Sequence, residues 1–279
     1  MPAASPTPAH PDVTVVIPVY KNAGTLVELR DRLVKTLATT PSSHEIVLVN
    51  DACPERSLAV LEEMAAHDST VSVIDLATNV GQHQAVMVGL AYARGQSVVI
   101  MDADLQDPPE AIPKLLERLR PGCDAVFAGR RGRYQSGFRL FTSRMFKRLL
   151  HMLSGVPPDA GIFVALSRNA VNRLLEMEGP RPFVVAMIGC TNLPMVSIPV
   201  ERDERSVGAS AYSFRMRLKS AWRGIWWTLC WKRPLLRRLF GTAPAQTQIQ
   251  ANLSARSATD ESSAQAGLVT QRSIKQESE

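Results

Sequence analysis

Two carboxylates separated by a single residue are the part of this sequence with the clearest chemistry. Asp102 and Asp104 directly follow residues 98–101, an unbroken apolar run typical of a strand buried on both faces of a parallel sheet. Ligands bind such sheets at the carboxyl ends of the strands, so both side chains are expected at a ligand crevice. Carboxylates this close repel each other unless a cation lies between them. We therefore predict that Asp102 and Asp104 hold a divalent cation.

Mg²⁺ or Mn²⁺ is the cation that this arrangement favours. Such an ion takes few protein carboxylates and completes its shell with water and phosphate oxygens, which predicts a diphosphate-containing substrate. Acidic residues after a strand can instead form turns or cap helices. We assign the capping role to Asp107, which with Pro108 and Glu110 has the spacing of a capping box. Asp102 and Asp104 then remain as the ligands.

The composition is that of a globular protein. The chain has 279 residues, of which 45% are hydrophobic and 21% charged. Its four cysteines are scattered singly, without the spacing of a zinc site, which favours free thiols in a reducing compartment. Residues 1–12 lack the apolar segment of a signal peptide and are expected to be disordered. We therefore expect a cytoplasmic protein.

The net charge of +6 is unevenly distributed, because residues 125–158 and 205–259 contain no acidic residue. Basic stretches of this kind can contact nucleic acid, an anionic membrane or a phosphorylated substrate, or can simply be solvated. No nucleic-acid-binding motif is present, so we expect no nucleic-acid partner.

Five predicted strands alternate with helices in the first half of the chain, at residues 13–20, 45–50, 71–76, 98–101 and 124–129. This order predicts a doubly wound, mostly parallel α/β sheet with helices on both faces. Thr25 and Glu28 have the spacing of a capping box at the start of the first helix. A dinucleotide-binding dehydrogenase shares the strand order but requires a glycine-rich turn after the first strand, and that turn is absent.

Four motifs at the ends of these strands carry a resemblance to a known family. They are Val-Ile-Pro-Val-Tyr at 16–20, Val-Asn-Asp at 49–51, Asn-Val-Gly-Gln-His-Gln-Ala at 79–85 and Met-Asp-Ala-Asp-Leu-Gln-Asp-Pro-Pro at 101–109. Together they resemble family 2 glycosyltransferases, in particular the polyprenyl-phosphate sugar transferases, which include dolichol-phosphate mannose synthase. The resemblance covers about residues 13–212 and implies the glycosyltransferase A-type fold.

The resemblance implies a role for each matching residue. Pro18 and Tyr20 would flank the nucleotide, Asp51 would accept hydrogen bonds from the base, and Gly81 would belong to the same donor site. Asp102 and Asp104 would hold the metal on the diphosphate of a nucleotide sugar. The family implies inversion by direct displacement, in which the metal neutralises the charge that develops on the leaving diphosphate.

The acceptor side of the site is less well defined by the sequence. Arg130 follows the fifth strand and is our candidate phosphate ligand, because guanidinium groups bind phosphate bidentately. Asp159 lies in a stretch similar to the family's Asp-x-Gly acceptor loop, although Ile162 and Val164 stand where an acid and an arginine are often found. Residues 202–212 resemble a basic loop that closes over the site, with Arg205 and Ser210 as its candidate contacts.

Several functions therefore stay open. The leading expectation is transfer of a sugar to a polyprenyl phosphate in cell-envelope glycan synthesis. The alternative is a soluble sugar or metabolite acceptor, for which Asp159 would be the general base. A nucleotidyltransferase and a catalytically silent nucleotide-binding module are more distant alternatives, and the oligomeric state is left open, a homo-oligomer included.

The last part of the chain divides into three segments. Residues 182–200 carry no charge, but their prolines and Gly189 favour a buried loop and strand over a membrane span, so no transmembrane helix is expected. Residues 213–240 combine basic residues with all four tryptophans, a composition that favours an amphipathic helix at an anionic membrane surface, although docking on the catalytic domain is the alternative. Residues 241–279 are polar and expected to be disordered. We thus expect a peripheral attachment to the inner face of the cell membrane.

Overall fold

The computed structural model describes residues 11–40, 42–131, 137–177, 182–201 and 214–233, together with residues 235 and 238. Its strands are β1 (Val13–Val19), β2 (His44–Asn50), β3 (Val71–Asp75), β4 (Ser97–Ile100), β5 (Ala125–Arg131), β6 (Val164–Ser167) and β7 (Met195–Glu201). Its helices are α1 (Leu26–Leu37), α2 (Ser57–His67), α3 (Gln82–Tyr92), α4 (Ile112–Arg118), α5 (Gly137–Ser154), α6 (Arg168–Glu176), α7 (Val184–Cys190) and α8 (Phe214–Lys232), with short 3₁₀ helices η1 (Ala23–Thr25) and η2 (Pro109–Ala111).

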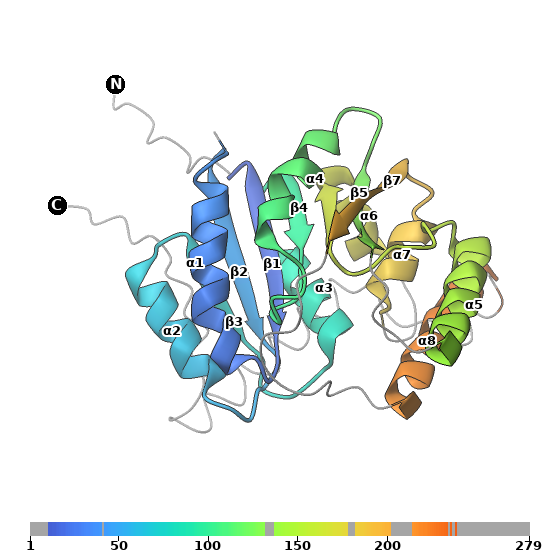
Figure 1. The fold of residues 1–279 in the computed structure, drawn as a ribbon, viewed down its shortest axis with the longest axis horizontal. Coiled ribbons are helices and arrows are strands. Elements are labelled where there is room, and N and C mark those ends of the chain that lie inside the picture. The colour runs from blue at the N-terminus through green and yellow to red at the C-terminus, as the bar shows by residue number, and fades with distance from the viewer. Residues whose placement is uncertain are drawn as a thin grey trace.

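The strands form one twisted sheet in the order β3-β2-β1-β4-β6-β5-β7 (Figure 1). Every pairing is parallel except those of β6, which runs antiparallel to both β4 and β5. Six strands therefore end at the same edge of the sheet, and β6 begins there. The predicted mostly parallel α/β sheet is confirmed.

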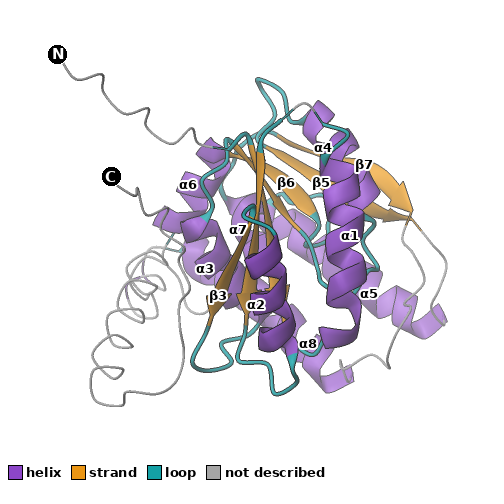
Figure 2. Ribbon diagram, turned by 90° about the vertical axis from the view of Figure 1, so that its left-hand side faces the viewer, coloured by secondary structure: helices purple, strands orange, loops and turns teal. Residues whose placement is uncertain are grey.

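Helices cover both faces of the sheet, as Figure 2 shows edge-on. One face packs against apolar side chains of α1, α2 and α4, and the other packs against α3, α6 and α7. All seven residues of β1 are buried, because the strand lies in the sheet interior between these two layers. Among the described residues, no helix has both the length and the hydropathy needed to cross a bilayer.

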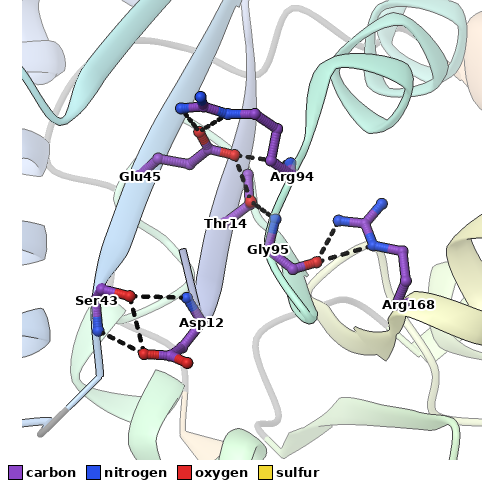
Figure 3. Close-up of polar contacts among 7 residues, drawn as sticks. All are labelled: Asp12, Thr14, Ser43, Glu45, Arg94, Gly95 and Arg168. Atoms are coloured by element: carbon purple, nitrogen blue, oxygen red, sulfur yellow. Dashed lines mark hydrogen bonds and ion pairs between the residues drawn. The ribbon is translucent and has the colours of Figure 1, made fainter. Parts of the chain in front are cut away.

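A network of polar contacts fixes the register at the amino edge of the sheet (Figure 3). The buried Glu45 carboxylate accepts a hydrogen bond from the Thr14 hydroxyl at 2.7 Å, and it pairs with the Arg94 guanidinium at 2.6 Å. Thr14 accepts in turn from the backbone N–H of Gly95 at 2.8 Å, while the Arg168 guanidinium donates to the Gly95 carbonyl. These contacts tie the beginnings of β1 and β2 to the loop that leads into β4.

Two local predictions were wrong. The uncharged stretch 182–200 was expected to be a loop and a strand, but it contains the helix α7 before β7. Every residue of α7 is buried, so its sequence lacks the polar face by which a surface helix is recognised. The helix start predicted at Asp107 is also shifted by one residue: Pro108, not Asp107, precedes the first residue of η2, and the Glu110 side chain binds Arg32 at 2.7 and 2.9 Å.

We predict that Glu45→Ala destabilises the fold by about 2–4 kcal/mol, because it leaves the Thr14 hydroxyl and the Arg94 N–H without their buried acceptor. Urea denaturation monitored by circular dichroism measures the change. The control is Asp31→Ala, which removes an exposed ion pair with Arg30 and should cost less than about 0.5 kcal/mol. Equal losses in the two variants would contradict a special role for the buried network.

Candidate active site

The sequence-predicted residues on the donor side gather at the carboxyl edge of the sheet. Tyr20 follows β1, Asp51 follows β2, and Asp102 and Asp104 follow β4. Because β1 lies between β2 and β4 in a parallel arrangement, the three strand ends are neighbours. The topology thus brings together residues that are up to 84 positions apart in the sequence.

Asp102 and Asp104 are both partly exposed, while Ala103 between them is buried. The Asp102 Oδ1 accepts a hydrogen bond from the side-chain amide of Gln82 at 2.5 Å. The Asp104 Oδ1 accepts from the backbone N–H of Gln106 at 3.2 Å, across a turn in which Leu105 has a φ of 58°. One oxygen of each carboxylate is therefore oriented by the protein.

Asp51 is almost completely buried, with 2% of its surface exposed. Its two carboxylate oxygens accept hydrogen bonds from the backbone N–H groups of Val80 at 2.7 Å and Gly81 at 2.9 Å. Burial raises the pKa of the Asp51 carboxyl above its ordinary value, and these two hydrogen bonds act in the opposite direction. The contacts hold the loop before α3, so Asp51 has a structural role in addition to the predicted contact with a base.

Pro18 and Tyr20 differ in their accessibility. Pro18 is buried in β1 opposite Val49, so it shapes the strand and presents no surface to a ligand. Tyr20 is 41% exposed, and the Lys21 ammonium lies 5.5 Å from the centre of its ring. Of the predicted pair, Tyr20 is thus the residue whose side chain a nucleotide can reach.

Left-handed backbone conformations occur at three non-glycine residues of this edge. Lys21, Ala52 and Leu105 have φ values of 59°, 46° and 58°. Each such conformation costs on the order of 1–2 kcal/mol and persists only where surrounding contacts impose it. Here the Cys53 sulfur accepts hydrogen bonds from the Lys21 N–H and the Ser57 hydroxyl, both at 3.1 Å. Strain is therefore concentrated at the predicted site.

On the acceptor side, Asp159 lies in a turn before β6, closed by a hydrogen bond from the Ala160 N–H to the Pro157 carbonyl at 3.0 Å. Its carboxylate rests directly on Gly129 of β5, where a Cβ atom would clash with it and with the Ser197 hydroxyl. The fold thus places Asp159 at the same sheet edge as the two carboxylates after β4, with a glycine making room for it.

The remaining predicted residues are only partly described. The backbone of Arg130 lies in β5, paired with Val200, but its side chain lies outside the described part of the structure. Arg205 and Ser210 also lie outside the described residues. Their predicted roles remain predictions.

Sequence reasoning missed the partners of two residues at this edge. Gln82, which orients Asp102, belongs to the motif at 79–85, but nothing in the sequence indicates its partner. Thr25 was predicted to cap α1, and it does occupy the N-cap position. No side-chain cap forms, however, because the Thr25 hydroxyl donates to the Ala103 carbonyl at 2.7 Å. The hydroxyl instead connects the start of α1 to the loop that carries both metal-binding candidates.

His83 is a second feature that the sequence did not reveal. Its ring lies 4.5 Å from that of Phe183, and its Nδ1 is buried without a hydrogen-bond partner. Burial, and to a smaller extent the charge of Arg223 on α8, lowers the pKa of His83 to about 4. Gly224 of α8 packs against the same Phe183 ring, where a Cβ would lie 2.9 Å from Cε1. His83 and Phe183 therefore link α3 to α8.

The residues after β4 fit an Mg²⁺ or Mn²⁺ ion. Both side chains are carboxylates, which are hard oxygen donors, and both are partly exposed at the carboxyl edge of the sheet. Mg²⁺ and Mn²⁺ require few protein carboxylates, because water and the oxygens of a diphosphate complete their coordination. Among the described residues, no cluster of three or more metal-ligating side chains is present.

Comparison with known proteins identifies the family. The family model for "Glycosyl transferase family 2" matches residues 14–175, which include every donor-side residue described above. The chain belongs to glycosyl transferase family 2. The resemblance seen in the sequence motifs is thereby confirmed.

Relatives of this family 2 glycosyltransferase include proteins named as undecaprenyl-phosphate sugar transferases. An uncharacterised glycosyltransferase, YkcC, from Bacillus subtilis is 32% identical over 77% of this chain and 68% of its own length. Undecaprenyl-phosphate 4-deoxy-4-formamido-L-arabinose transferases are 37% identical in Klebsiella pneumoniae and 35% in Shewanella sediminis, over 74% and 72% of this chain. The chain spans only 64% and 62% of the length of these last two proteins.

Solved structures with the same fold include two glycosyltransferases crystallised with Mn²⁺. One is the mannosyltransferase PcManGT from Pyrobaculum calidifontis with GDP-mannose, with a TM-score of 0.57 and 18% identity over 94% of this chain and 77% of that one. The other is glucosyl-3-phosphoglycerate synthase from Mycobacterium tuberculosis with UDP, with a TM-score of 0.54 and 18% identity over 79% of each chain. They support the predicted glycosyltransferase A-type fold.

We predict that the neutral, buried His83 makes the protein less stable in acid. Between about pH 6.5 and pH 4 the unfolded chain binds a proton at this residue that the folded protein does not bind, so the free energy of unfolding falls as the pH falls. The residue as a whole is partly exposed, so we expect a loss of roughly 2 kcal/mol across this window.

Urea denaturation at pH 7.0 and pH 4.5 tests this effect. In His83→Gln the difference in unfolding free energy between the two pH values should shrink by most of that amount. The exposed His67 of α2 supplies the control, since His67→Gln should keep the wild-type pH dependence. An unchanged pH dependence in His83→Gln would show that other groups cause the acid sensitivity.

Proposed function

We propose that this protein transfers a sugar from a nucleotide sugar to a polyprenyl phosphate, using Mg²⁺ or Mn²⁺. The observation that carries this proposal is the pair Asp102 and Asp104, each with one oriented oxygen, at the carboxyl edge of a family 2 sheet. Asp159 lies at the same edge of the sheet, against Gly129 of β5, which is separated from β4 by one strand.

The donor half follows from the chemistry of the leaving group. The nucleoside diphosphate departs with negative charge, and a metal held by Asp102 and Asp104 supplies the Lewis acid that neutralises it. Tyr20 is exposed for contact with the base, and the loop fixed by Asp51 presents the start of α3 to the same edge. The solved neighbours with GDP-mannose or UDP bind Mn²⁺ on the same fold, which supports the choice of cofactor.

The acceptor follows from the curated relatives. Those from Klebsiella and Shewanella are named as acting on undecaprenyl phosphate, and the match covers more than 70% of this chain. In the proposed reaction a phosphate oxygen of the acceptor attacks the anomeric carbon of the sugar while the bond to the nucleoside diphosphate breaks, with inversion. The attacking phosphate is already anionic at neutral pH, so the step requires no strong general base.

A polyprenyl acceptor brings the enzyme to a membrane, and the structure changes which residues we assign to that contact. Trp227 is 1% exposed and stacks on Trp231 at 5.7 Å, and α8 packs on α5 and α7. These tryptophans belong to the domain core and its flank, so a lipid layer would not reach Trp227. Trp222, by contrast, is 63% exposed.

The helix α5 adds a second exposed apolar surface beside α8. Met145, Leu149 and Met152 are 62%, 40% and 78% exposed, and their spacing places them on one face of the helix. Arg148 is exposed in the same helix. We propose that this stripe and Trp222 contact an anionic membrane at the inner face of the cell membrane.

We predict that the protein transfers radiolabelled sugar from a mixture of nucleotide sugars to undecaprenyl phosphate in detergent. Transfer should stop in EDTA and return with Mn²⁺. Asp104→Asn should lower the rate at least about 100-fold, because the diphosphate loses its metal-mediated charge stabilisation. Asp31→Asn, an exposed change on α1, should leave the rate unchanged.

Calorimetric titration of UDP, GDP and dTDP with Mn²⁺ identifies the nucleotide and separates the alternatives. Failure of all three to bind, or binding that survives both EDTA and Asp104→Asn, would contradict the proposed donor site. Product formed only with soluble acceptors would replace the lipid acceptor and make Asp159 the candidate general base. Release of pyrophosphate would identify a nucleotidyltransferase, and binding without turnover a silent module.

We predict that flotation with vesicles containing phosphatidylglycerol depends on the exposed apolar residues. Combined replacement Met152→Ser and Trp222→Ser should weaken binding at least about tenfold, since two apolar side chains no longer enter the interface. Val196→Ser, which changes an exposed residue of β7, serves as the control. Binding should also weaken at high salt, and equal flotation of all three proteins would refute the assignment.

A further inference from the structure

A small apolar cavity of about 90 Å³ lies beside the acceptor loop. Three elements enclose it: the second half of α5, the loop before β6, and the chain around the start of α7. Its lining consists of Phe146, Lys147, Leu150, Val156, Pro157, Pro158, Ala160, Phe183 and Val185. Eight of these nine side chains are apolar, and Lys147 carries the single charge of this lining.

The cavity is directly connected to the acceptor side of the site. Pro157, Pro158 and Ala160 belong to the turn that presents Asp159 against Gly129 of β5. A ligand in the cavity therefore lies next to the residue that the sequence places in the acceptor loop.

The cavity wall and the contact that orients Asp102 involve consecutive residues of α3. Phe183 forms part of the wall and contacts the His83 ring, and His83 follows Gln82, whose amide holds Asp102. This arrangement suits a ligand whose head reacts at the metal site while its tail stays in the cavity.

The residues that line the cavity favour an apolar tail over a polar one. A sugar or a phosphoglycerate carries hydroxyl groups that would lose their hydrogen bonds to water against eight apolar side chains. A hydrocarbon has no such hydrogen bonds to lose, and an apolar cavity of about 90 Å³ suits a small branched hydrocarbon group such as one isoprene unit. The Lys147 ammonium complements an anionic head group at the end of such a tail.

We propose that this cavity binds the isoprene unit next to the phosphate of a polyprenyl phosphate, with Lys147 on the phosphate side. The proposal rests on the proposed function and adds the site that recognises the lipid. The exposed Met145, Leu149 and Met152 lie on the same helix as the cavity-lining Phe146 and Leu150. The remainder of the lipid can therefore leave along α5 towards the membrane surface.

Filling the cavity tests this assignment. Ala160→Leu adds three carbon atoms to a partly exposed lining residue, and it should raise the KM for undecaprenyl phosphate about tenfold or more. The KM for the nucleotide sugar should change less than twofold, because the donor half is untouched. The control Ala59→Leu makes the same change at an exposed position of α2, and both KM values should stay at the wild-type level.

A second measurement does not depend on the variant folding normally. Geranyl phosphate contains two isoprene units, and in the wild-type protein it should compete with undecaprenyl phosphate, whereas inorganic phosphate at the same concentration should not. In Ala160→Leu this inhibition should weaken together with lipid affinity. Nucleotide binding by calorimetry shows whether the variant is folded.

The outcomes separate this proposal from the one on which it rests. If the wild-type protein uses only soluble acceptors, the proposed function fails. If it uses undecaprenyl phosphate but Ala160→Leu keeps the wild-type KM and geranyl phosphate does not compete, the lipid binds elsewhere and only this inference is refuted.

Discussion

The carboxylate of Asp51 is the contact on which the arrangement of the site depends. By accepting hydrogen bonds from the N–H groups of Val80 and Gly81, it joins the end of β2 to the start of α3. That start sets Gln82 against Asp102 and His83 against Phe183. One buried acid thus fixes both a metal-binding candidate and the wall shared by α8 and the apolar cavity. Its burial is offset by two backbone donors, which is how a carboxylate can remain inside a protein.

The two edges of the sheet differ in their polar contacts and in their backbone conformations. At the amino edge, Glu45 and Thr14 are buried and fully engaged with neighbouring groups, and this network stabilises the register (Figure 3). At the carboxyl edge, Lys21, Ala52 and Leu105 adopt costly backbone conformations, and partly exposed carboxylates face solvent. The hydrogen bonds at the amino edge stabilise the sheet, and the strained backbone conformations lie at the edge where the ligand is proposed to bind.

The donor half could be predicted from the sequence because its signals are local. Buried β-branched runs located the strands, and each candidate residue directly follows one, so parallel topology alone brings Asp51, Asp102 and Asp104 together. The acceptor half depends on packing between distant segments. The four-residue antiparallel strand β6 and the fully buried helix α7 have no periodic pattern of apolar residues by which they could be recognised. On the donor side, the same limit applies to Thr25, whose hydroxyl donates to the distant Ala103 carbonyl instead of capping its own helix.

The basic, tryptophan-rich segment shows why composition alone does not decide between a membrane surface and packing on the domain. Tryptophan suits both a membrane interface and a protein core, and the choice depends on what the fold supplies as a partner. Here the Phe183 ring packs against Gly224 of α8, and Trp227 of the same helix is buried in the core. This helix therefore packs on the domain. Besides Trp222 of α8, exposed apolar residues of this region lie on α5, the same helix that lines the cavity near Asp159. In this proposal α5 contacts the membrane, lines the lipid cavity and leads directly into the acceptor loop. A lipid bound at the membrane surface would therefore lie close to the place where its phosphate reacts.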